Sequence, residues 1–277
     1  MGDARRMQHR RQAVVVAVVT VLVAGLALGG LAAARSDRTT SPGVREAATD
    51  PQQPAAPAVV TDCWVPLDAA NIALTSTEAM ALTTAAASAG QGARGESRVE
   101  AAVDSGLDLP PEQAATVVRS LLGNPSTQRL TCSYARLGVE PEEAGPSGLT
   151  PRARRLRTAW AEVFGDLPEG GFARGGVDSG HVDSSSHYDG RAVDVFFRPV
   201  GDAEERRRAR VFAQWLVAHA QEYNVLSVIF ADQIWTSWAA YAGWREYVHP
   251  SGNRTDPVLR HLDHVHVAVE SGRPFHG

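Results

Sequence analysis

The stretch SSSHYDGRAVDVFF, residues 184–197, places a histidine, a glycine and an aspartate ahead of a run of strand-forming residues. His187 lies three residues before Gly190 and seven residues before Asp194. An imidazole on the loop entering a strand and a carboxylate on that strand can bind one metal ion if the chain turns between them. Gly190 supplies that turn, and Ala192 leaves space beneath the metal.

A second stretch near the C-terminus, RHLDHVHVAV, carries His264 and His266. Side chains two residues apart on a strand point to the same face of a sheet. His187, Asp194 and one histidine of this pair would give zinc three protein ligands and leave a fourth, tetrahedral position to water. An H-x-H pair alone is more often two solvated or core histidines, so the prediction of a metal site depends on both stretches together.

Both stretches resemble known metal-binding motifs. The first matches, at every fixed position, the S-x-H-x-x-G-x-A-x-D signature of zinc D-alanyl-D-alanine peptidases, and HYDGRAVD looks like the same segment of hedgehog signalling domains. The terminal HVHVAV is similar to the H-x-H strand of the same superfamily and of lysostaphin-type peptidases. Over about residues 151–269, the resemblance implies a small α+β fold around a central antiparallel sheet, with one zinc ion held by His187, Asp194 and His266.

The resemblance leaves open which residue carries protons. The D-Ala-D-Ala peptidases have a catalytic Glu three residues before the last ligand, where this chain has Asp263 followed by His264. Asp is one methylene shorter than Glu, and on a regular strand Asp263 and His266 face opposite sides. His264 shares a face with His266, whereas the family pattern favours a carboxylate, so Asp263 and His264 both stay candidates for the general base.

Three further residues are candidates for contact with a substrate. Arg174, in GGFARGG, is the candidate for the arginine that grips the substrate in the D-Ala-D-Ala enzymes. Ser185 is expected to hydrogen-bond the backbone or a group behind the metal ligands. Trp235 belongs to an aromatic stretch that could line a cleft, although burial is the commoner fate of such rings. Three more histidines are expected near the site without a metal-binding role: His181, His249 and His261.

The elements that would position these residues lie in a predicted zinc-peptidase-like domain, residues 146–277. A helix is expected over 151–165, since Thr150 is a good N-cap and Pro suits the first helical position. A second helix is expected over about 203–222, behind the N-cap Asp202. The runs AVDVFF, VLSVIF and HVHVAV predict strands. These few elements indicate a compact α+β domain.

Residues 61–145 are predicted to form a small helical region. TSTEAMALTTAAASA opens with a capping box between Thr75 and Glu78, and PPEQAATVVRSLLG begins with Pro at the first turn of a helix. The chain's two cysteines, Cys63 and Cys132, form an even pair that favours a disulfide in an exported segment. Two buried free thiols are the alternative. The region carries no catalytic cluster, which leaves positioning or partner contact as its role.

The N-terminus indicates export. Residues 13–34 form an uncharged apolar run long enough to span about 30 Å of hydrocarbon. The arginines of residues 1–12 predict a cytoplasmic N-terminus and a single-pass anchor. A cleaved signal peptide, which would make the protein secreted, is the alternative because residues 32–34 are all Ala. Residues 35–60, rich in Pro, Thr, Ser and Asp, predict a disordered linker.

The expected function follows from the motifs and the export signal together. The net charge of −4 gives no indication of nucleic-acid binding. The resemblance implies a membrane-anchored, extracytoplasmic zinc metallopeptidase that hydrolyses peptide bonds of peptidoglycan in the bacterial cell wall, as a carboxypeptidase or an endopeptidase. The alternative is a catalytically inactive, zinc-stabilised binding module of the cell envelope, which the missing Glu favours.

Overall fold

The computed structural model describes several ranges of the chain: 62–67, 71–90, 107–123, 130–134 and 138–272. All of them belong to one compact unit. The predicted cytoplasmic N-terminus, membrane anchor and linker, residues 1–12, 13–34 and 35–60, lie outside the described residues. None of the helices within those ranges is both long and apolar enough to cross a membrane.

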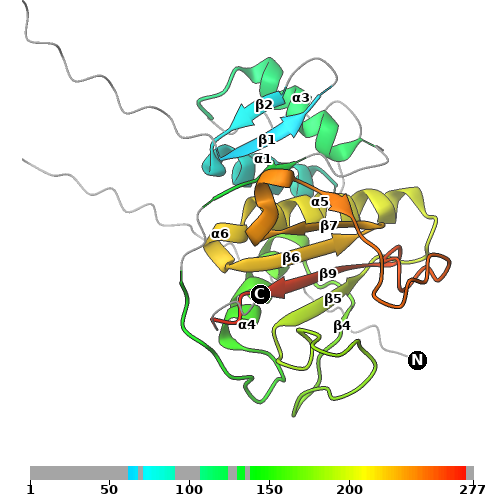
Figure 1. The fold of residues 1–277 in the computed structure, drawn as a ribbon. Helices are drawn as coiled ribbons and strands as arrows, with labels where there is room; N and C mark the ends of the chain where they lie inside the picture. The colour runs from blue at the N-terminus through cyan, green and yellow to red at the C-terminus, as the bar shows by residue number, and fades with distance from the viewer. Residues whose placement is uncertain (1–61, 68–70, 91–106, 124–129, 135–137, 273–277) are drawn as a thin grey trace, which may run out of the picture. The chain divides into compact units, whose positions relative to one another are not determined.

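A six-stranded antiparallel sheet forms the centre of this unit (Figure 1). Its strands lie in the order β4-β5-β9-β6-β7-β8. Their bounds are Glu169–Gly170 (β4), Ala192–Phe196 (β5), Val225–Phe230 (β6), Gln233–Thr236 (β7), Arg245–Glu246 (β8) and His264–Val269 (β9). The three predicted strands are confirmed as β5, β6 and β9, and the predicted α+β class with an antiparallel sheet is confirmed with them.

Strand β7 has no strong signal in the sequence. It pairs with β6 through a two-residue turn in which Phe230 lies opposite Gln233. Ala231 and Asp232 both have positive φ, 50° and 60°, as the tight hairpin turn between twisted strands requires. Ala-Asp lacks the Asn-Gly or Asp-Gly signature of such turns. A short 3-10 helix, η1 (Ser237–Ala242), follows β7 and leads to β8.

The pairing of β5 with β9 sorts their side chains into two sets. Asp194 lies opposite His266 and Phe196 lies opposite His264, and the residues between them are valines. Alternate residues of a strand point to opposite faces of the sheet. One face of this pair therefore carries valines, and the other face carries the aspartate and the histidines.

Helices α4 (Pro151–Phe164) and α5 (Ala203–Ala218) pack against the valine face, and Figure 1 shows α5 behind the sheet. The predicted caps are confirmed. The Thr150 side chain accepts a hydrogen bond from the N–H of Ala153, and Asp202 accepts from the N–H groups of Glu204 and Glu205. Both helices therefore begin where their capping residues predict.

The second helix ends earlier than predicted. Helix α5 stops at Ala218, and a short helix, α6 (Ala220–Tyr223), follows after His219. The N–H of His219 still donates to the carbonyl of Trp215 (3.0 Å), but the backbone of His219 leaves the helical conformation, with φ of −94° and ψ of 8°, and α5 ends there. Asn224 then adopts a left-handed conformation with φ of 54°, which ends α6.

The prediction of a helical region over residues 61–145 is only partly right. Helices α1 (Ser76–Gly90) and α3 (Pro111–Leu122) are confirmed. A small antiparallel sheet of order β2-β1-β3 lies with them and was not predicted. Its strands are β1 (Cys63–Pro66), β2 (Asn71–Leu74) and β3 (Thr131–Cys132). Strands of two to four residues are too short for an alternating hydrophobic pattern to reveal them.

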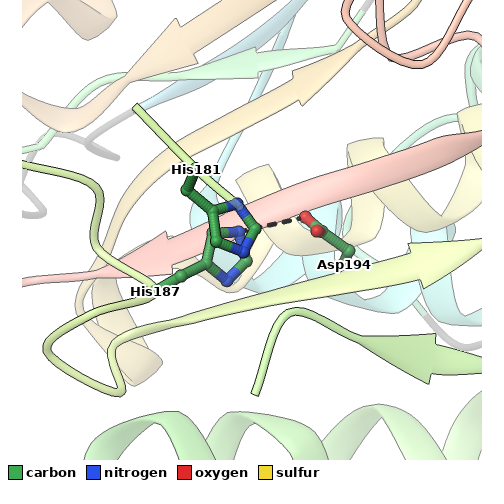
Figure 2. A group of neighbouring side chains, drawn as sticks. All are labelled: His181, His187 and Asp194. Atoms are coloured by element: carbon green, nitrogen blue, oxygen red, sulfur yellow. Dashed lines mark ion pairs between the residues drawn. The ribbon is translucent and has the colours of Figure 1, made fainter. Parts of the chain in front are cut away.

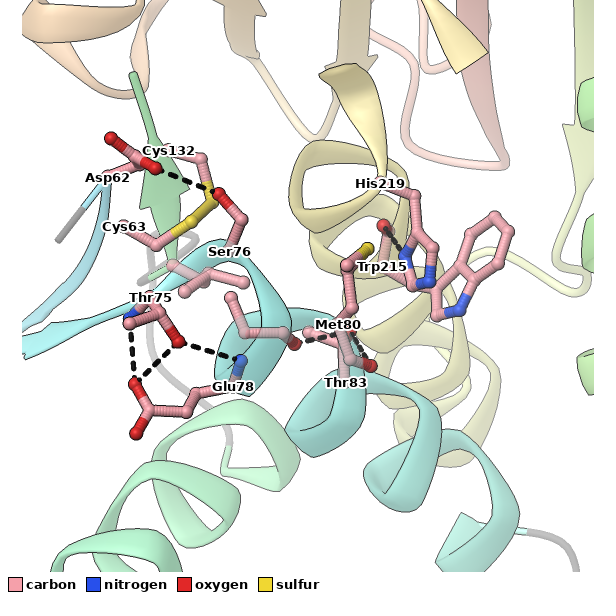
Figure 3. Close-up of a disulfide and its surroundings, with 12 residues drawn as sticks. Asp62, Cys63, Thr75, Ser76, Glu78, Met80, Thr83, Cys132, Trp215 and His219 are labelled. Carbon is pink, nitrogen blue, oxygen red and sulfur yellow. Dashed lines mark hydrogen bonds between the residues drawn. A yellow bond between two sulfur atoms is a disulfide. The ribbon is translucent and has the colours of Figure 1, made fainter. Parts of the chain in front are cut away.

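The predicted disulfide and capping box are both present in this region (Figure 3). Cys63 and Cys132 lie opposite each other on β1 and β3 and are joined by the disulfide. The N–H of Thr75 donates to Glu78 Oε2 (2.7 Å), and the N–H of Glu78 donates to Thr75 Oγ1 (3.2 Å). The sheet and the first turn of α1 are thus fixed by bonds that the sequence predicts.

The small sheet and the helices α1 and α3, which we call the N-terminal layer, pack on the side of α5 that faces away from the central sheet. The indole N–H of Trp215 donates to Thr84 Oγ1 (3.1 Å), and the N–H of Leu130 donates to Gln214 Oε1 (3.0 Å). Residues 209–218 of α5 are all buried, because the sheet lies on one side of the helix and the N-terminal layer lies on the other. The described residues before and after position 145 therefore share one hydrophobic core.

Candidate metal site

His187 lies on the loop before β5, and its ring is fixed by a backbone carbonyl. Nδ1 of His187 donates to the carbonyl oxygen of Gly171, 2.8 Å away, which leaves Nε2 with a free lone pair. Gly171 has a φ of +78°, and a Cβ at this position would lie 2.5 Å from His187 Nδ1. Only glycine permits this approach. The loop turns at Gly190, with φ of 65°, as the sequence predicts.

Three donor atoms from three segments converge on the polar face of the sheet. His187 Nε2 lies 3.3 Å from Asp194 Oδ1 and 3.1 Å from His266 Nδ1. His266 Nδ1 lies 3.0 Å from Asp194 Oδ1. The pairing of β5 with β9 places Asp194 and His266 directly opposite each other, and the loop before β5 adds the third ring.

This donor set fits a small, nitrogen- and oxygen-binding cation. Ligand atoms in a tetrahedral zinc site lie about 3.3 Å apart, given zinc–ligand bonds of about 2.0–2.1 Å, and the three separations are close to that value. Burial raises the pKa of Asp194, but hydrogen bonds to His187 and His266 outweigh burial and hold its pKa far below the ordinary value. The carboxylate therefore stays ionised, as a metal ligand must be.

His181 is a further candidate ligand, to which the sequence assigned no metal-binding role. Its ring stacks on that of His187 with centroids 4.0 Å apart (Figure 2). Ligand atoms of His181, His187 and Asp194 all lie within 4.8 Å of one another, so these three residues could hold a metal ion. Tyr188 positions His181, since its hydroxyl accepts from the N–H of His181 and donates to the carbonyl of the same residue.

Two overlapping ligand sets therefore share His187 and Asp194. The first is completed by His181 and the second, with shorter separations, by His266. The sequence carries little signal for His181 because the residues between it and His187, VDSSS, form an irregular turn. Neither periodicity nor spacing could show that this turn stacks the two rings.

Asp263 and His264, the two candidates for a proton carrier, are hydrogen-bonded to each other. His264 Nδ1 lies 2.8 Å from Asp263 Oδ1. The guanidinium of Arg198 binds the other oxygen of Asp263, with Nε at 2.9 Å and Nη2 at 2.6 Å. His264 Nε2 is left facing the candidate ligands and lies 3.8 Å from Asp194 Oδ1. Arg198 is a residue that sequence reasoning missed.

The predicted substrate contacts lie in different surroundings. Ser185 accepts a hydrogen bond from the N–H of His187 (3.4 Å), which agrees with the predicted role in holding the loop. Arg174 is exposed on the loop that follows Gly171. Trp235 is fully buried, 0% exposed, beside the ring of Tyr134. Its predicted contact with substrate is therefore corrected, because the side chain packs in the core.

Two other histidines have supporting surroundings. The His261 ring lies 4.6 Å from that of His264 and 5.8 Å from that of His266. Burial lowers the pKa of His261 to about 2, so this imidazole is neutral. His249 Nδ1 lies 2.8 Å from the hydroxyl of Ser251, on a loop after β8. His261 thus belongs to the wall of the site, and His249 is part of a turn.

Comparisons with known proteins relate part of this region to one family. Residues 145–259 match the family model described as VldE, C-terminal domain. The matched range includes His181, His187 and Asp194, and it ends before His264 and His266. It covers less than half of the chain. No curated protein and no solved structure matches the chain. Over residues 145–259, the chain is similar to the C-terminal domain of VldE.

Proposed function

We propose that this protein is a zinc-dependent hydrolase that cleaves peptide bonds of the bacterial cell wall. One observation carries the proposal: two imidazole nitrogens and a carboxylate oxygen converge within 3.3 Å of one another on one face of the sheet. Nitrogen ligands with one carboxylate and a small coordination sphere are typical of zinc. His187, Asp194 and His266 would hold the ion, with His181 as the alternative to His266.

The chain's own residues supply the rest of the chemistry. When bound, zinc acts as a Lewis acid that polarises carbonyl groups and makes water a nucleophile near neutral pH. His264 Nε2 faces the ligands and can accept the proton that an attacking water loses, then pass it to the leaving amine. Asp263 is the second candidate for this role. The hydrogen bonds of its two oxygens to His264 and Arg198 make it the weaker one.

The substrate and the location rest on the resemblance of the motifs. The Ser185–Asp194 string resembles zinc D-alanyl-D-alanine peptidases, whose substrates are cell-wall peptides. The predicted anchor at residues 13–34 and linker at 35–60 would hold the site outside the membrane, close to peptidoglycan. The proposal includes both carboxypeptidase and endopeptidase activity, and secretion if the N-terminal helix is cleaved.

A second function is favoured by the surroundings of Asp263. In the peptidases that the motifs resemble, a Glu three residues before the last ligand is catalytic. Here the carboxylate at that position is 3% exposed and is bound by Arg198 and His264. Such an arrangement also suits a zinc-stabilised binding module without turnover. In that case peptidoglycan would be a ligand and not a substrate.

The test uses the full-length, zinc-loaded protein and purified muropeptides, with products followed by mass spectrometry. The hydrolase proposal expects new peptide fragments from the unmutated protein and none from Asp194→Ala. His264→Ala should lower turnover by about 10²–10⁴, the usual contribution of a general base, with zinc retained. If Asp263→Ala loses this turnover and His264→Ala keeps the turnover of the unmutated protein, Asp263 is the general base. Absence of products together with retained binding to muropeptides would favour the binding module.

A further inference from the structure

Arg198, Asp263 and His264 form a chain of contacts that ends at the candidate metal ligands. Nε and Nη2 of Arg198 both donate to Asp263 Oδ2, and Asp263 Oδ1 faces His264 Nδ1. Each carboxylate oxygen thus has its own partner. The geometry points to Arg198 and Asp263 as positioning residues that fix the His264 ring with Nε2 toward the ligands. This inference rests on the proposed hydrolase function of the same site.

The carboxylate of Asp263 can turn neither away from His264 nor toward the ligands without losing a bond. Because Arg198 holds one oxygen and His264 faces the other, a rotation of the carboxylate would break a charge-assisted hydrogen bond at one of its two ends. Asp263 and His264 are 3% and 5% exposed, so a broken bond would leave a buried polar group without a partner. Burial raises the pKa of Asp263, but hydrogen bonds to His264 and Arg198 outweigh this and lower its pKa.

The backbone of the sheet brings Arg198 to this place. His264 lies opposite Phe196 in the β5–β9 pair, and the N–H of Phe197 donates to the carbonyl of Asp263 (2.8 Å). Arg198 follows directly. Its guanidinium lies over the Phe196 ring, 4.1 Å from the centroid, and that ring is 5.7 Å from the His264 ring. One aromatic side chain therefore supports both ends of the contact chain.

The consequence for His264 is a defined tautomer. An ionised carboxylate only accepts hydrogen bonds, so the proton of a neutral His264 sits on Nδ1 and the lone pair on Nε2. Nε2 is the atom that faces the ligands. In the proposed reaction, the proton released by the attacking water moves to Nε2 and then to the leaving amine, while Asp263 stays a carboxylate. A similar carboxylate orients the histidine of the Ser-His-Asp triad.

The test compares Arg198→Gln and Asp263→Asn with a matched control in the full-length, zinc-loaded protein. Arg208→Gln is the control because Arg208 pairs with Glu205 (2.8 Å) and lies over the neighbouring ring of Phe197, yet belongs to α5 on the valine face. Two readouts are needed. The first is kcat and KM on muropeptides, with and without about 50 mM guanidinium, which is far below denaturing concentrations. The second is the tautomer of His264 from long-range ¹H–¹⁵N NMR, assigned with His264→Gln.

We expect Asp263→Asn to lower kcat by about 10²–10⁴ with zinc content unchanged, because the tautomer is lost. Arg198→Gln should lower kcat by about 10- to 100-fold with little change in KM. Added guanidinium should restore part of that loss, and Arg198→Lys should retain part of the activity. In NMR spectra the unmutated protein should carry the His264 proton on Nδ1, and Asp263→Asn should lose this preference. Arg208→Gln should match the unmutated protein in both readouts.

Unchanged kcat in Arg198→Gln, or an unchanged His264 tautomer in Asp263→Asn, would overturn the inference. The inference would also be overturned if Arg198→Gln lost kcat, guanidinium did not restore it, and the His264 tautomer stayed intact. Arg198 would then act only on the fold. The NMR readout needs no turnover. If the unmutated protein cleaves nothing, the hydrolase proposal fails, whereas the positioning of His264 by Asp263 and Arg198 is still decided by the tautomer.

Discussion

The two faces of the central sheet differ in kind, although the same strands build both. Toward α4 and α5, β5 and β9 present valines that belong to a core with aromatic rings such as Phe212. On the opposite face the same strands present Asp194, His264 and His266. A shift of one residue in either strand would exchange the two sets. Core and candidate site are therefore specified by one pairing register.

The valines and the polar side chains differ in what makes their burial favourable. Valines gain free energy on burial, roughly 25 cal/mol per Å² of apolar surface. Carboxylates and imidazoles lose hydration and need partners. On the polar face those partners are neighbouring polar groups and, as proposed, a metal ion. We therefore expect changes on the valine face to act on stability and changes on the polar face to act on metal binding.

Removal of a ligand should give the largest effect and separate the faces most clearly. Asp194→Ala should reduce zinc content from about one ion per chain to nearly none, because the shared carboxylate of both ligand sets is lost. Elemental analysis of metal-replete protein measures this, and circular dichroism checks the fold. Asp189→Ala, on the loop just before β5 and paired with Arg191, is the control and should keep its zinc. Near-zero zinc in the unmutated protein would contradict the metal site as a whole.

A large-to-small change on the valine face should show the reverse behaviour. Phe212 is 0% exposed and packs against the rings of Trp160, Phe164 and Phe197. Phe212→Ala should lower the free energy of unfolding by about 3–5 kcal/mol, with zinc stoichiometry unchanged in the folded protein. Denaturant titration gives the first quantity and elemental analysis the second. Tyr241→Ala, at a 77% exposed ring, should shift stability by less than about 0.5 kcal/mol.

A pair of glycine variants tests how the His187 ring is held. Gly171→Ala should weaken zinc affinity by about 10- to 100-fold, the usual effect of disturbing a group that orients a ligand. Its Cβ would collide with the His187 ring, whereas at Gly175, with a similar φ of +85°, a Cβ meets nothing within 4 Å. Both glycines have a positive φ of similar size, so the main difference between the variants is the contact of the Cβ at Gly171 with the His187 ring and, at 3.0 Å, with Asp194 Oδ2. Equal zinc affinities from competition titration would show that Gly171 has no part in holding the ring.

The smallest expected effect is a pH dependence of the free energy of unfolding that comes from His219, at the end of α5 on the valine face. His219 is buried with its ring stacked on Trp215 (4.0 Å), and burial lowers its pKa. The unfolded chain, with an ordinary pKa near 6.5, binds this proton first as pH falls. The free energy of unfolding should therefore decrease as pH drops from about 6.5 toward the lower pKa of the folded state.

His219→Gln should remove this part of the pH dependence. Denaturant titrations at about pH 7.5 and 5.5, in the presence of a chelator, isolate it from metal binding. If the variant and the unmutated protein lose the same stability between the two pH values, His219 does not contribute to the loss.

The sequence predicts those parts of the fold that have a recognisable hydrophobic pattern or a helix-capping residue. Strands β5, β6 and β9 follow from their hydrophobic runs, and the starts of α4 and α5 follow from Thr150 and Asp202. The disulfide follows from the count of cysteines. The β6–β7 turn and the short strands β1 to β3 have no comparable signal, because their conformation is set by tertiary packing.

The site divides in the same way. His187, Asp194 and His266 follow from spacing and from the resemblance, and the structure brings them together. His181 and Arg198 could not be chosen from sequence, since one depends on an irregular turn and the other on the β5–β9 register. Trp235 was placed at the site by its aromatic neighbours, but burial within the core decides its position.

The separation of the ligands along the chain has a thermodynamic consequence. Asp194 and His266 are 72 residues apart and meet only when β5 pairs with β9. An unfolded chain therefore offers a metal ion single, scattered ligands, whereas the folded chain offers them together. An ion that binds only the native state shifts the folding equilibrium by mass action, in proportion to the logarithm of its concentration relative to Kd. A higher zinc level around the protein would then raise its free energy of unfolding.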